Sequence, residues 1–278
     1  MKNTALLAPL PLALLFATAS SFGQQPAAPS RYLTVISVKV APDKVAAFVD
    51  FYKSGPGVKS ARARLKADPN LLRWTVLQAV YPGDPAPAAN FLIASVTIGA
   101  PPDPDDAKRD ELYRAATGMV YADYMQKFRT MGDNVGSTIS HVHNTTDLYS
   151  LSPGDYLVLN RLKTTEGKNT ELSDLMRDFR LPLANERAKA SGDFKGWSFS
   201  HLTFPGGRSL PYDASEASVF KTLAGALGGP GTGGGTAMVA AFAKHFPNKS
   251  YTGFIDAGRE SSRVVRHELY RVVMAVQQ

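Results

Sequence analysis

An alternating aromatic and polar row near the middle of the chain offers the clearest candidate chemistry. Trp197, Phe199 and His201 occupy every second position of a β-type sequence, so their side chains share one face of a strand. Apolar walls with a few placed polar groups are typical of small-molecule pockets, and a neutral imidazole can act as a general base near neutral pH. We therefore expect Trp197 and Phe199 to contact a ligand and His201 to be the candidate catalytic residue. The alternative is ordinary core in which His201 is simply hydrogen-bonded.

The same row has a counterpart upstream at a constant shift of 123 residues. Trp74 corresponds to Trp197 and Gln78 to His201, so we expect Trp74 and Gln78 to line the same ligand site. The shift also relates positions in three predicted elements: Val35 with Val158, Ala61 with Ala184, Arg64 with Arg187, Ala67 with Ala190, and 94–96 with 217–219. One fixed shift through several elements indicates an internal repeat.

Two further histidines lie on one predicted strand. His141 and His143 are two residues apart, which places their rings on one face, about 6–7 Å apart by the strand rise. Such a pair can begin a metal site that still needs a third ligand from elsewhere, and without a carboxylate-rich motif no metal site is predicted. His267 lies in the matching strand of the other half, so His141 and His267 are expected to meet at the ligand cavity.

Composition and charge exclude several classes of protein. The chain has no cysteine, which rules out a disulfide scaffold, a thiol enzyme and a cysteine-ligated metal site. Its formal net charge of +7 is spread along the sequence without a long basic run. A diffuse basic excess bears on solubility and weak attraction to anions, so no nucleic-acid partner is expected.

The first residues predict export. Lys2 precedes an apolar stretch at 5–17, and small residues follow; this is the pattern of a secretory signal peptide. We expect residues 1–23 to be the signal, cleaved between Ala19 and Gly23, and 24–30 to be a linker. The apolar stretch is shorter than the roughly 20 residues that span a bilayer, so no membrane span is expected and the location is periplasmic or extracellular.

The remaining chain divides into two halves, 31–150 and 151–278, each with the order strand, helix, strand, strand, helix, strand. The first half shows β-type or helical patterns at 32–40, 42–66 (with a break at 55–57), 72–81, 90–98, 105–131 (with Gly118 as a weak point) and 136–149. The second half repeats them at 155–163, 172–179 (followed by a break at Pro182), 196–204, 213–220, 237–246 and 262–276. This order is the βαββαβ, or ferredoxin-like, arrangement. The predicted fold class is α+β, with two tandem repeats packed sheet to sheet as an intramolecular α+β barrel.

This organisation resembles the dimeric α+β barrel superfamily, which includes antibiotic-biosynthesis-monooxygenase-like and NIPSNAP-like proteins. The resemblance rests on the element order and on Leu-Pro-Leu-Ala-Asn-Glu-Arg (181–187) leading into Gly196 and Trp197. It is similar to tandem, secreted members, and it implies a cavity between two sheets. No catalytic residue set is carried over, because no motif of the superfamily's enzymes matches this sequence.

Three functional hypotheses follow. The first is binding of a small apolar or aromatic molecule in the inter-sheet cavity, with or without a monooxygenase-like, cofactor-independent oxidation. The second is a non-catalytic structural or interaction module, in which His201→Ala changes stability but no ligand affinity. The third is haem binding through a histidine inside the cavity. The sequence leaves the cofactor undetermined, and it leaves open whether the protein is a monomer or a weak homodimer.

Overall fold

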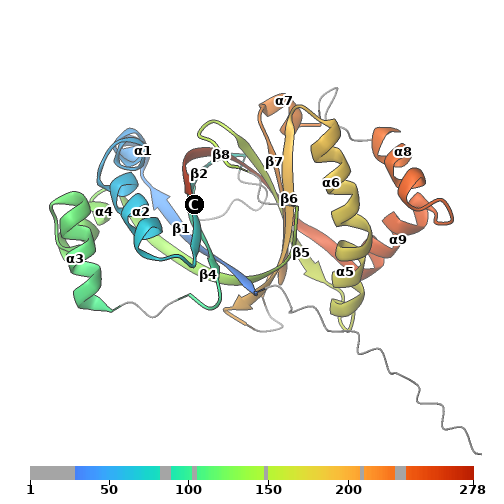
Figure 1. Ribbon diagram of the computed structural model, residues 1–278, viewed down its shortest axis with the longest axis horizontal. Helices are drawn as coiled ribbons and strands as arrows, with labels where there is room; N and C mark the ends of the chain where they lie inside the picture. The colour runs from blue at the N-terminus through green and yellow to red at the C-terminus, as the bar shows by residue number, and fades with distance from the viewer. Residues whose placement is uncertain (1–28, 82–88, 102–104, 147–149, 207–209, 229–235) are drawn as a thin grey trace, which may run out of the picture.

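The computed structural model describes residues 29–81, 89–101, 105–146, 150–206, 210–228 and 236–278 (Figure 1). The predicted signal peptide and most of the predicted linker lie outside these residues. No helix within the described ranges is long and apolar enough to cross a membrane.

The two halves contribute four strands each. The first half contains β1 (Arg31–Val40), α1 (Val45–Lys53), α2 (Pro56–Ala67), β2 (Leu71–Tyr81), β3 (Phe91–Ile98), α3 (Asp106–Thr117), α4 (Tyr121–Arg129) and β4 (Gly132–Thr145). The second half contains β5 (Tyr156–Thr164), α5 (Asn169–Leu175), a π-helical turn (Met176–Arg180), α6 (Leu181–Ala190), β6 (Phe194–Phe204), β7 (Ala214–Phe220), α7 (Leu223–Ala226), α8 (Thr236–His245), α9 (Tyr251–Ser261) and β8 (Ser262–Gln277).

All eight strands form one closed antiparallel barrel. Their order around it is β1-β3-β2-β8-β5-β7-β6-β4, with β4 returning to β1. The halves meet at two hydrogen-bonded seams, β2 with β8 and β4 with β6. The prediction of sheets packed face to face is therefore incomplete, because the edges of the two sheets also pair and leave neither edge open.

The strand register relates the halves closely. Trp74 pairs with Ser95 on β3, and Trp197 pairs with Ser218 on β7, so the shift of 123 residues describes both strand pairs. The first strand of each half departs from it, because Ala94 pairs with Val35 whereas its counterpart Ala217 pairs with Leu159. The equivalent of Val35 is thus Leu159, and the predicted match with Val158 is wrong by one residue, which reverses the face.

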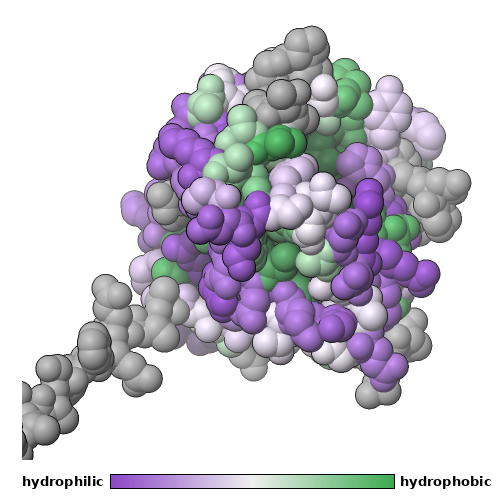
Figure 2. All heavy atoms as spheres, turned by 90° about the vertical axis from the view of Figure 1, so that its right-hand side faces the viewer, coloured by the Kyte–Doolittle hydropathy of each residue, from purple (hydrophilic) through white to green (hydrophobic). Residues whose placement is uncertain are grey.

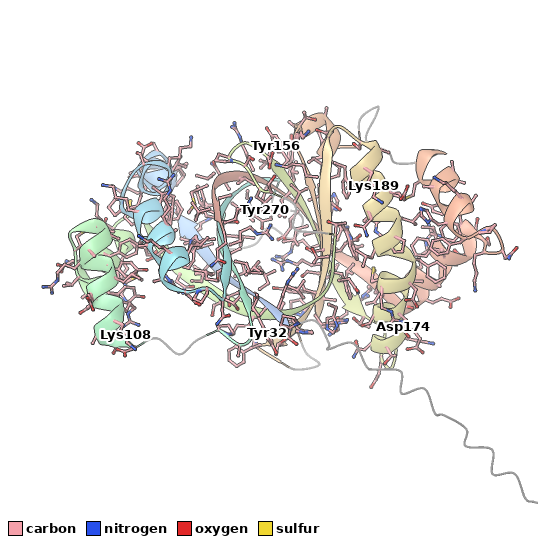
Figure 3. The ribbon with its side chains drawn as sticks, in the orientation of Figure 1. Tyr32, Lys108, Tyr156, Asp174, Lys189 and Tyr270 are labelled. Atoms are coloured by element: carbon pink, nitrogen blue, oxygen red, sulfur yellow. The ribbon has the colours of Figure 1, made fainter. Side chains whose placement is uncertain are left out.

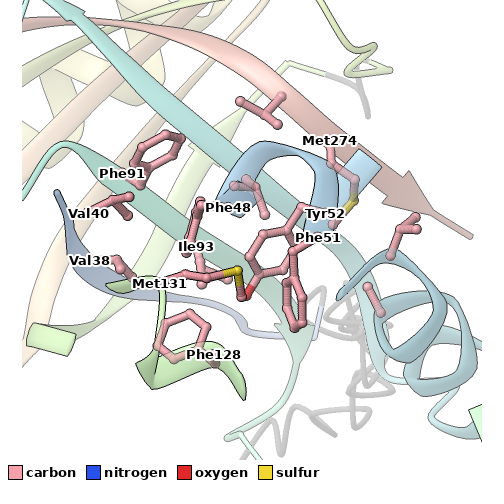
Figure 4. Packing of buried hydrophobic residues seen from close by; sticks show 14 of the residues in the cluster. Val38, Val40, Phe48, Phe51, Tyr52, Phe91, Ile93, Phe128, Met131 and Met274 are labelled. Atoms are coloured by element: carbon pink, nitrogen blue, oxygen red, sulfur yellow. The ribbon is translucent and has the colours of Figure 1, made fainter. Parts of the chain in front are cut away.

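Helices cover the outside of the barrel on two opposite sides. Figure 1 shows α1 to α4 on one side and α5, α6, α8 and α9 on the other. On the first side, Phe48, Phe51 and Tyr52 of α1 pack against Phe91 and other residues of the sheet (Figure 4). The stripe at i, i+3 and i+4 is the pattern of an amphipathic helix lying on a core.

The second helical side differs from the prediction. The chain passes through the π-helical turn directly into α6, with Pro182 in the first turn of α6, where proline is tolerated, so the predicted break at Pro182 is wrong. The additional helix α9 was not predicted. It packs with α8 and Phe179 through an aromatic cluster that includes Phe242 and Phe254. Hydrophilic residues form much of the rim of this face, and hydrophobic residues show through near its middle (Figure 2).

The prediction of one helix over 105–131 is also corrected at Gly118. This glycine has φ +77° and ends α3, a left-handed conformation that favours glycine at a helix end. The chain then restarts as α4. The two helices pack Tyr113, Tyr124 and Phe128 into the first core.

Candidate functional site

The barrel interior holds a cavity of about 100 Å³. The face that lines it is opposite to the predicted one. Trp197 and Phe199 are fully buried outside the barrel, between β6 and the second helical layer. Trp74 packs against the first helical layer in the same way, with the Arg64 guanidinium 4.5 Å from its ring centre. The expectation that these aromatic side chains line the inter-sheet cavity is wrong.

The size of the side chains explains which face of each strand points into the barrel. A narrow eight-stranded barrel has room for small and medium side chains in its interior, whereas the gap between a sheet and its helices accepts large aromatic rings. On β6 the alternate positions Ser198 and Ser200 therefore line the cavity, and Trp197 and Phe199 face the helices.

One side of the cavity wall is polar and basic. A row of paired residues runs across five strands, from Arg31 through Val142, Ser200 and Ser215 to Arg161. All five line the cavity. The row places two guanidinium groups and two hydroxyl groups along half of the barrel wall.

A third arginine lies close to Arg31. Arg73 pairs with Val96, which pairs with Leu33, the interior residue that follows Arg31 on β1. Arg73 lines the cavity as well. Three arginines that line one low-dielectric space attract an anionic group.

Arg161 is anchored by a buried carboxylate. Its Nε donates to Glu268 Oε2 at 3.0 Å and its Nη1 to Ser215 Oγ at 3.2 Å, and Glu268 is 1% exposed. Burial and the negative charge of Glu268 raise the pKa of the Tyr270 phenol. The hydroxyl of Tyr270 therefore stays protonated inside the barrel at neutral pH.

The side of the cavity opposite the serines is apolar, because β2 and β3 lie across the barrel from β6 and β7. Leu77 and Leu92 pair across β2 and β3, and Leu157 on β5 with Leu151 just before it adds to the apolar lining. In Figure 3, Tyr32 and Tyr156, near the starts of β1 and β5, lie on opposite sides of the barrel, and Tyr270 lies between them. The interior is therefore amphipathic across the barrel.

The histidines gather on the outer face of β4 and β6 instead. Nδ1 of His141 lies 3.2 Å from Nε2 of His143, and the ring centres of His143 and His201 are 4.9 Å apart. His141 pairs in register with His201. The prediction that His141 and His143 share a strand face is confirmed, but that face is outside the barrel.

His201 is held by a neighbouring helix. Its Nε2 lies 3.1 Å from Ser173 Oγ on α5. Burial lowers the pKa of His201, opposed in part by Asp213. Desolvation, followed by repulsion from His201 and His141, lowers the pKa of His143 to about 4. A neutral imidazole with a free nitrogen is a metal ligand or a base.

A groove of about 740 Å³ opens beside this cluster. His143, His201 and Ser173 line it together with Lys163 and Asp213. Asp213 accepts hydrogen bonds from the backbone and hydroxyl groups of Thr164 and pairs with Lys163 at 3.1 Å. The groove is polar, open to solvent and separate from the residues that line the barrel cavity.

The two remaining predicted site residues lie apart from each other and from the cavity. Gln78 lines a shallow surface pocket with Lys53 and Arg271. His267 is exposed, pairs in register with Asn160, and has its Nδ1 2.5 Å from Asn160 Oδ1. The expectation that His267 meets His141 is wrong, because three strands separate β8 from β4 in each direction around the barrel.

A buried ionic network lies under the π-helical turn. Glu216 is 8% exposed and accepts hydrogen bonds from Trp197 Nε1 at 2.6 Å and Arg180 Nε at 2.7 Å. Burial would raise the pKa of Glu216, but the charge of Arg180 and the donated hydrogen bonds outweigh it and lower that pKa. The equivalent indole nitrogen, Nε1 of Trp74, is buried without a hydrogen-bond partner among the described residues.

Sequence reasoning missed the residues that do line the cavity. Arg73 and Arg161 lie within predicted strands and Arg31 directly precedes one, and the serines flank the conspicuous aromatics. The signal that could have found them is a charged or hydroxyl residue within an otherwise apolar strand, which needs a reason to be buried.

Comparisons with known proteins agree with the fold. No protein-family model and no curated protein sequence matches the chain. The structure is similar to that of a candidate monooxygenase from Lactobacillus acidophilus NCFM, with a TM-score of 0.53 and 8% identity over 90% of this chain and 97% of that one. It is also similar to a candidate monooxygenase from Fusobacterium nucleatum subsp. nucleatum, with a TM-score of 0.55 and 8% identity over 90% and 95% of the two chains. At these identities the likeness shows the fold alone, a mixed α+β protein with a large antiparallel sheet of the α+β barrel type.

Proposed function

We propose that the barrel binds a small amphipathic acid, with the anionic group at Arg31, Arg73 and Arg161 and the apolar part against the leucines. The observation that carries the proposal is the row of register partners that joins Arg31 to Arg161 through Ser200 and Ser215. Guanidinium groups bind carboxylates through paired hydrogen bonds, and the hydroxyl groups of the same row add donors. This refines the predicted ligand, a small apolar or aromatic molecule, by adding a negative charge.

Cavity size limits the ligand. The space of about 100 Å³ is somewhat smaller than an engineered cavity of about 150 Å³ that accepts benzene. A short-chain carboxylic acid is therefore the expected class, and hexanoate, with two more heavy atoms than benzene, enters only if side chains that line the cavity move. Leu77, Leu92 and Leu157 would then contact its hydrocarbon part.

The proposal is for binding and includes no catalytic step. His201, the predicted base, lies on the outer face beside Ser173, so it does not reach a molecule inside the barrel. The haem hypothesis requires a histidine in the cavity, and none occurs among the described residues that line it. The hypotheses of catalysis by His201 and of haem binding therefore each lack the histidine that they require inside the barrel.

Isothermal titration calorimetry with hexanoate and its neutral analogue hexanol tests the proposal. We expect hexanoate to bind at least ten-fold more tightly than hexanol, a difference of about 1.4 kcal/mol. Arg31→Gln should reduce hexanoate affinity about ten-fold or more, because a hydrogen bond to a charged group contributes roughly 1.5–3 kcal/mol. Arg129→Gln, a change at an exposed residue of α4, is the matched control. Equal binding of the two probes would contradict the proposal.

We also propose that the chain arose by internal duplication and that it is exported. Equal strand orders in the two halves and the shared register at Trp74 and Trp197 support two tandem ferredoxin-like repeats at 31–150 and 151–278. Pairing of both sheet edges within one chain favours a monomer or weak homodimer. The signal sequence supports a periplasmic or extracellular location. Cell fractionation with N-terminal sequencing should find the mature chain outside the cytoplasm, beginning between Ala19 and Gly23.

A further inference from the structure

A pair of ring nitrogens on β4 has the spacing of two ligands on one metal ion. Nδ1 of His141 and Nε2 of His143 are 3.2 Å apart. Two nitrogens bound to the same ion at about 2.0–2.1 Å lie roughly 2.9 Å apart at a right angle and roughly 3.3 Å apart at the tetrahedral angle. The observed separation falls between these two values, so an ion can bridge the nitrogens with the strand backbone unchanged.

The surroundings hold both rings in place on an accessible surface. His143 is exposed and His141 is partly exposed. Tyr32 on β1 pairs in register with His141, and their ring centres are 5.3 Å apart. Phe199 and His201 on β6 lie against the other side of His143. The pair is therefore flanked by neighbouring strands on both sides and remains open outward.

We infer that His141 and His143 form a chelating site for a divalent transition-metal ion, with water completing the coordination. Among the described residues, no three His, Cys, Asp or Glu side chains are arranged to hold an ion, so the site has two protein ligands. His201 is excluded from it because its Nε2 contacts Ser173.

The chemistry of binding is a tautomeric exchange. At 3.2 Å one ring donates its hydrogen to the other ring's nitrogen, and a bound ion takes the place of that hydrogen. The donor ring then carries its hydrogen on its remaining nitrogen, so two neutral imidazoles bind the ion without net proton release. Imidazole ligands favour Cu²⁺ over Ni²⁺ and Zn²⁺.

Metal titration of the tag-free chain tests this site. Calorimetry with Cu²⁺, Ni²⁺ and Zn²⁺ at pH 7 should give one site per chain, with Cu²⁺ bound most tightly. Electron paramagnetic resonance of the Cu²⁺ complex should show coupling to two nitrogen nuclei. His141→Ala and His143→Ala should each weaken Cu²⁺ binding at least ten-fold.

Matched histidine variants keep the test specific. His267→Ala changes an exposed histidine on β8, away from the pair, and should leave Cu²⁺ affinity within two-fold. His201→Ala should leave it within three-fold. Circular dichroism must show that each variant is folded, and His143→Asn serves if His143→Ala is not. Unchanged Cu²⁺ affinity in folded His141 and His143 variants, or a ten-fold loss in His201→Ala, would overturn the assignment.

Discussion

Glu216 and Ile93 occupy equivalent positions in the two halves, as their pairing partners show. Glu216 pairs with Phe199 and Ile93 with Val76, and both pairs follow the shift of 123 residues. In the second half the carboxylate binds the indole of Trp197 and the guanidinium of Arg180. In the first half the residue is apolar. One substitution at this position therefore separates an ionic core from a hydrophobic one.

We predict that Glu216→Ile lowers the free energy of unfolding by about 3 kcal/mol, because the buried indole of Trp197 loses its acceptor and the partly buried Arg180 loses its ionic partner. The double variant Glu216→Ile with Arg180→Met should be less destabilised than Glu216→Ile alone, since it imitates the first half. Chemical denaturation measures both. Glu171→Gln, at an exposed ion pair with Lys168, should cost under about 1 kcal/mol. A double variant no more stable than the single one would contradict this account.

His143 predicts a second effect, on the pH dependence of stability. Its pKa is about 4 in the folded chain and about 6.5 in an unfolded chain. Between these values the unfolded chain binds a proton that the folded chain does not, so stability falls as the pH falls from about 6.5 to about 4.

Urea denaturation of wild type and His143→Gln over this pH range measures the effect. The variant should lose less stability on acidification than the wild type, with the difference confined to the range between the two pKa values. Parallel curves for the two proteins across that range would show that His143 is not the group responsible.

At the scale of elements, the alternation of residues identified the strands but not the side that faces inward. On β2 and β6 both faces contact other residues, one face in the interior and the other under helices. A period of two assigns the residues of a strand to two faces, but hydrophobicity alone does not show which face points into the barrel. On β6, Ser198 and Ser200 point into the barrel. If the other face of this sheet were exposed to water, Trp197 would instead have been expected on the face between the two sheets.

Site residues could be predicted from the sequence only where their proximity does not depend on the pairing of distant strands. The pairing of His141 and His143 depends on two residues of one strand, so the sequence could predict it. The row from Arg31 to Arg161 crosses five strands and depends on the register of four strand pairs. The helix α9 and the π-helical turn likewise depend on packing within the second half.

The face assignment leads to a prediction at Ala217. This side chain lines the cavity on β7, so Ala217→Leu should fill it and reduce hexanoate binding at least ten-fold, with a cost in stability of about 1–3 kcal/mol from overpacking. Ser218→Ala, at the neighbouring position on the opposite face, should leave the affinity unchanged. Calorimetry of both variants checks the assignment. Normal binding by a folded Ala217→Leu protein would place the ligand elsewhere.

At the scale of the whole molecule, closure of the barrel makes the halves dependent on each other. The interior cluster combines Leu77 and Leu92 of the first half with Leu159, Val219 and Tyr270 of the second. Separation would expose this cluster and break both seams, β2 with β8 and β4 with β6. Exposed apolar faces and open sheet edges promote association.

We predict that the halves 31–150 and 151–278, produced separately, aggregate or unfold, and that they form a soluble one-to-one complex when produced together. Size-exclusion chromatography with light scattering distinguishes these outcomes. The intact chain, purified in the same way, is the control. Two halves that are each monomeric and stable alone would show that barrel closure is unnecessary for folding.

The most direct test of the proposed function is a crystal structure of the chain with hexanoate. We predict that the carboxylate lies between the guanidinium groups of Arg31, Arg73 and Arg161, and that the alkyl chain points toward Leu77 and Leu157. Hexanoate bound on the outer face, beside Trp197 or His201, with the barrel interior unchanged would contradict the central claim.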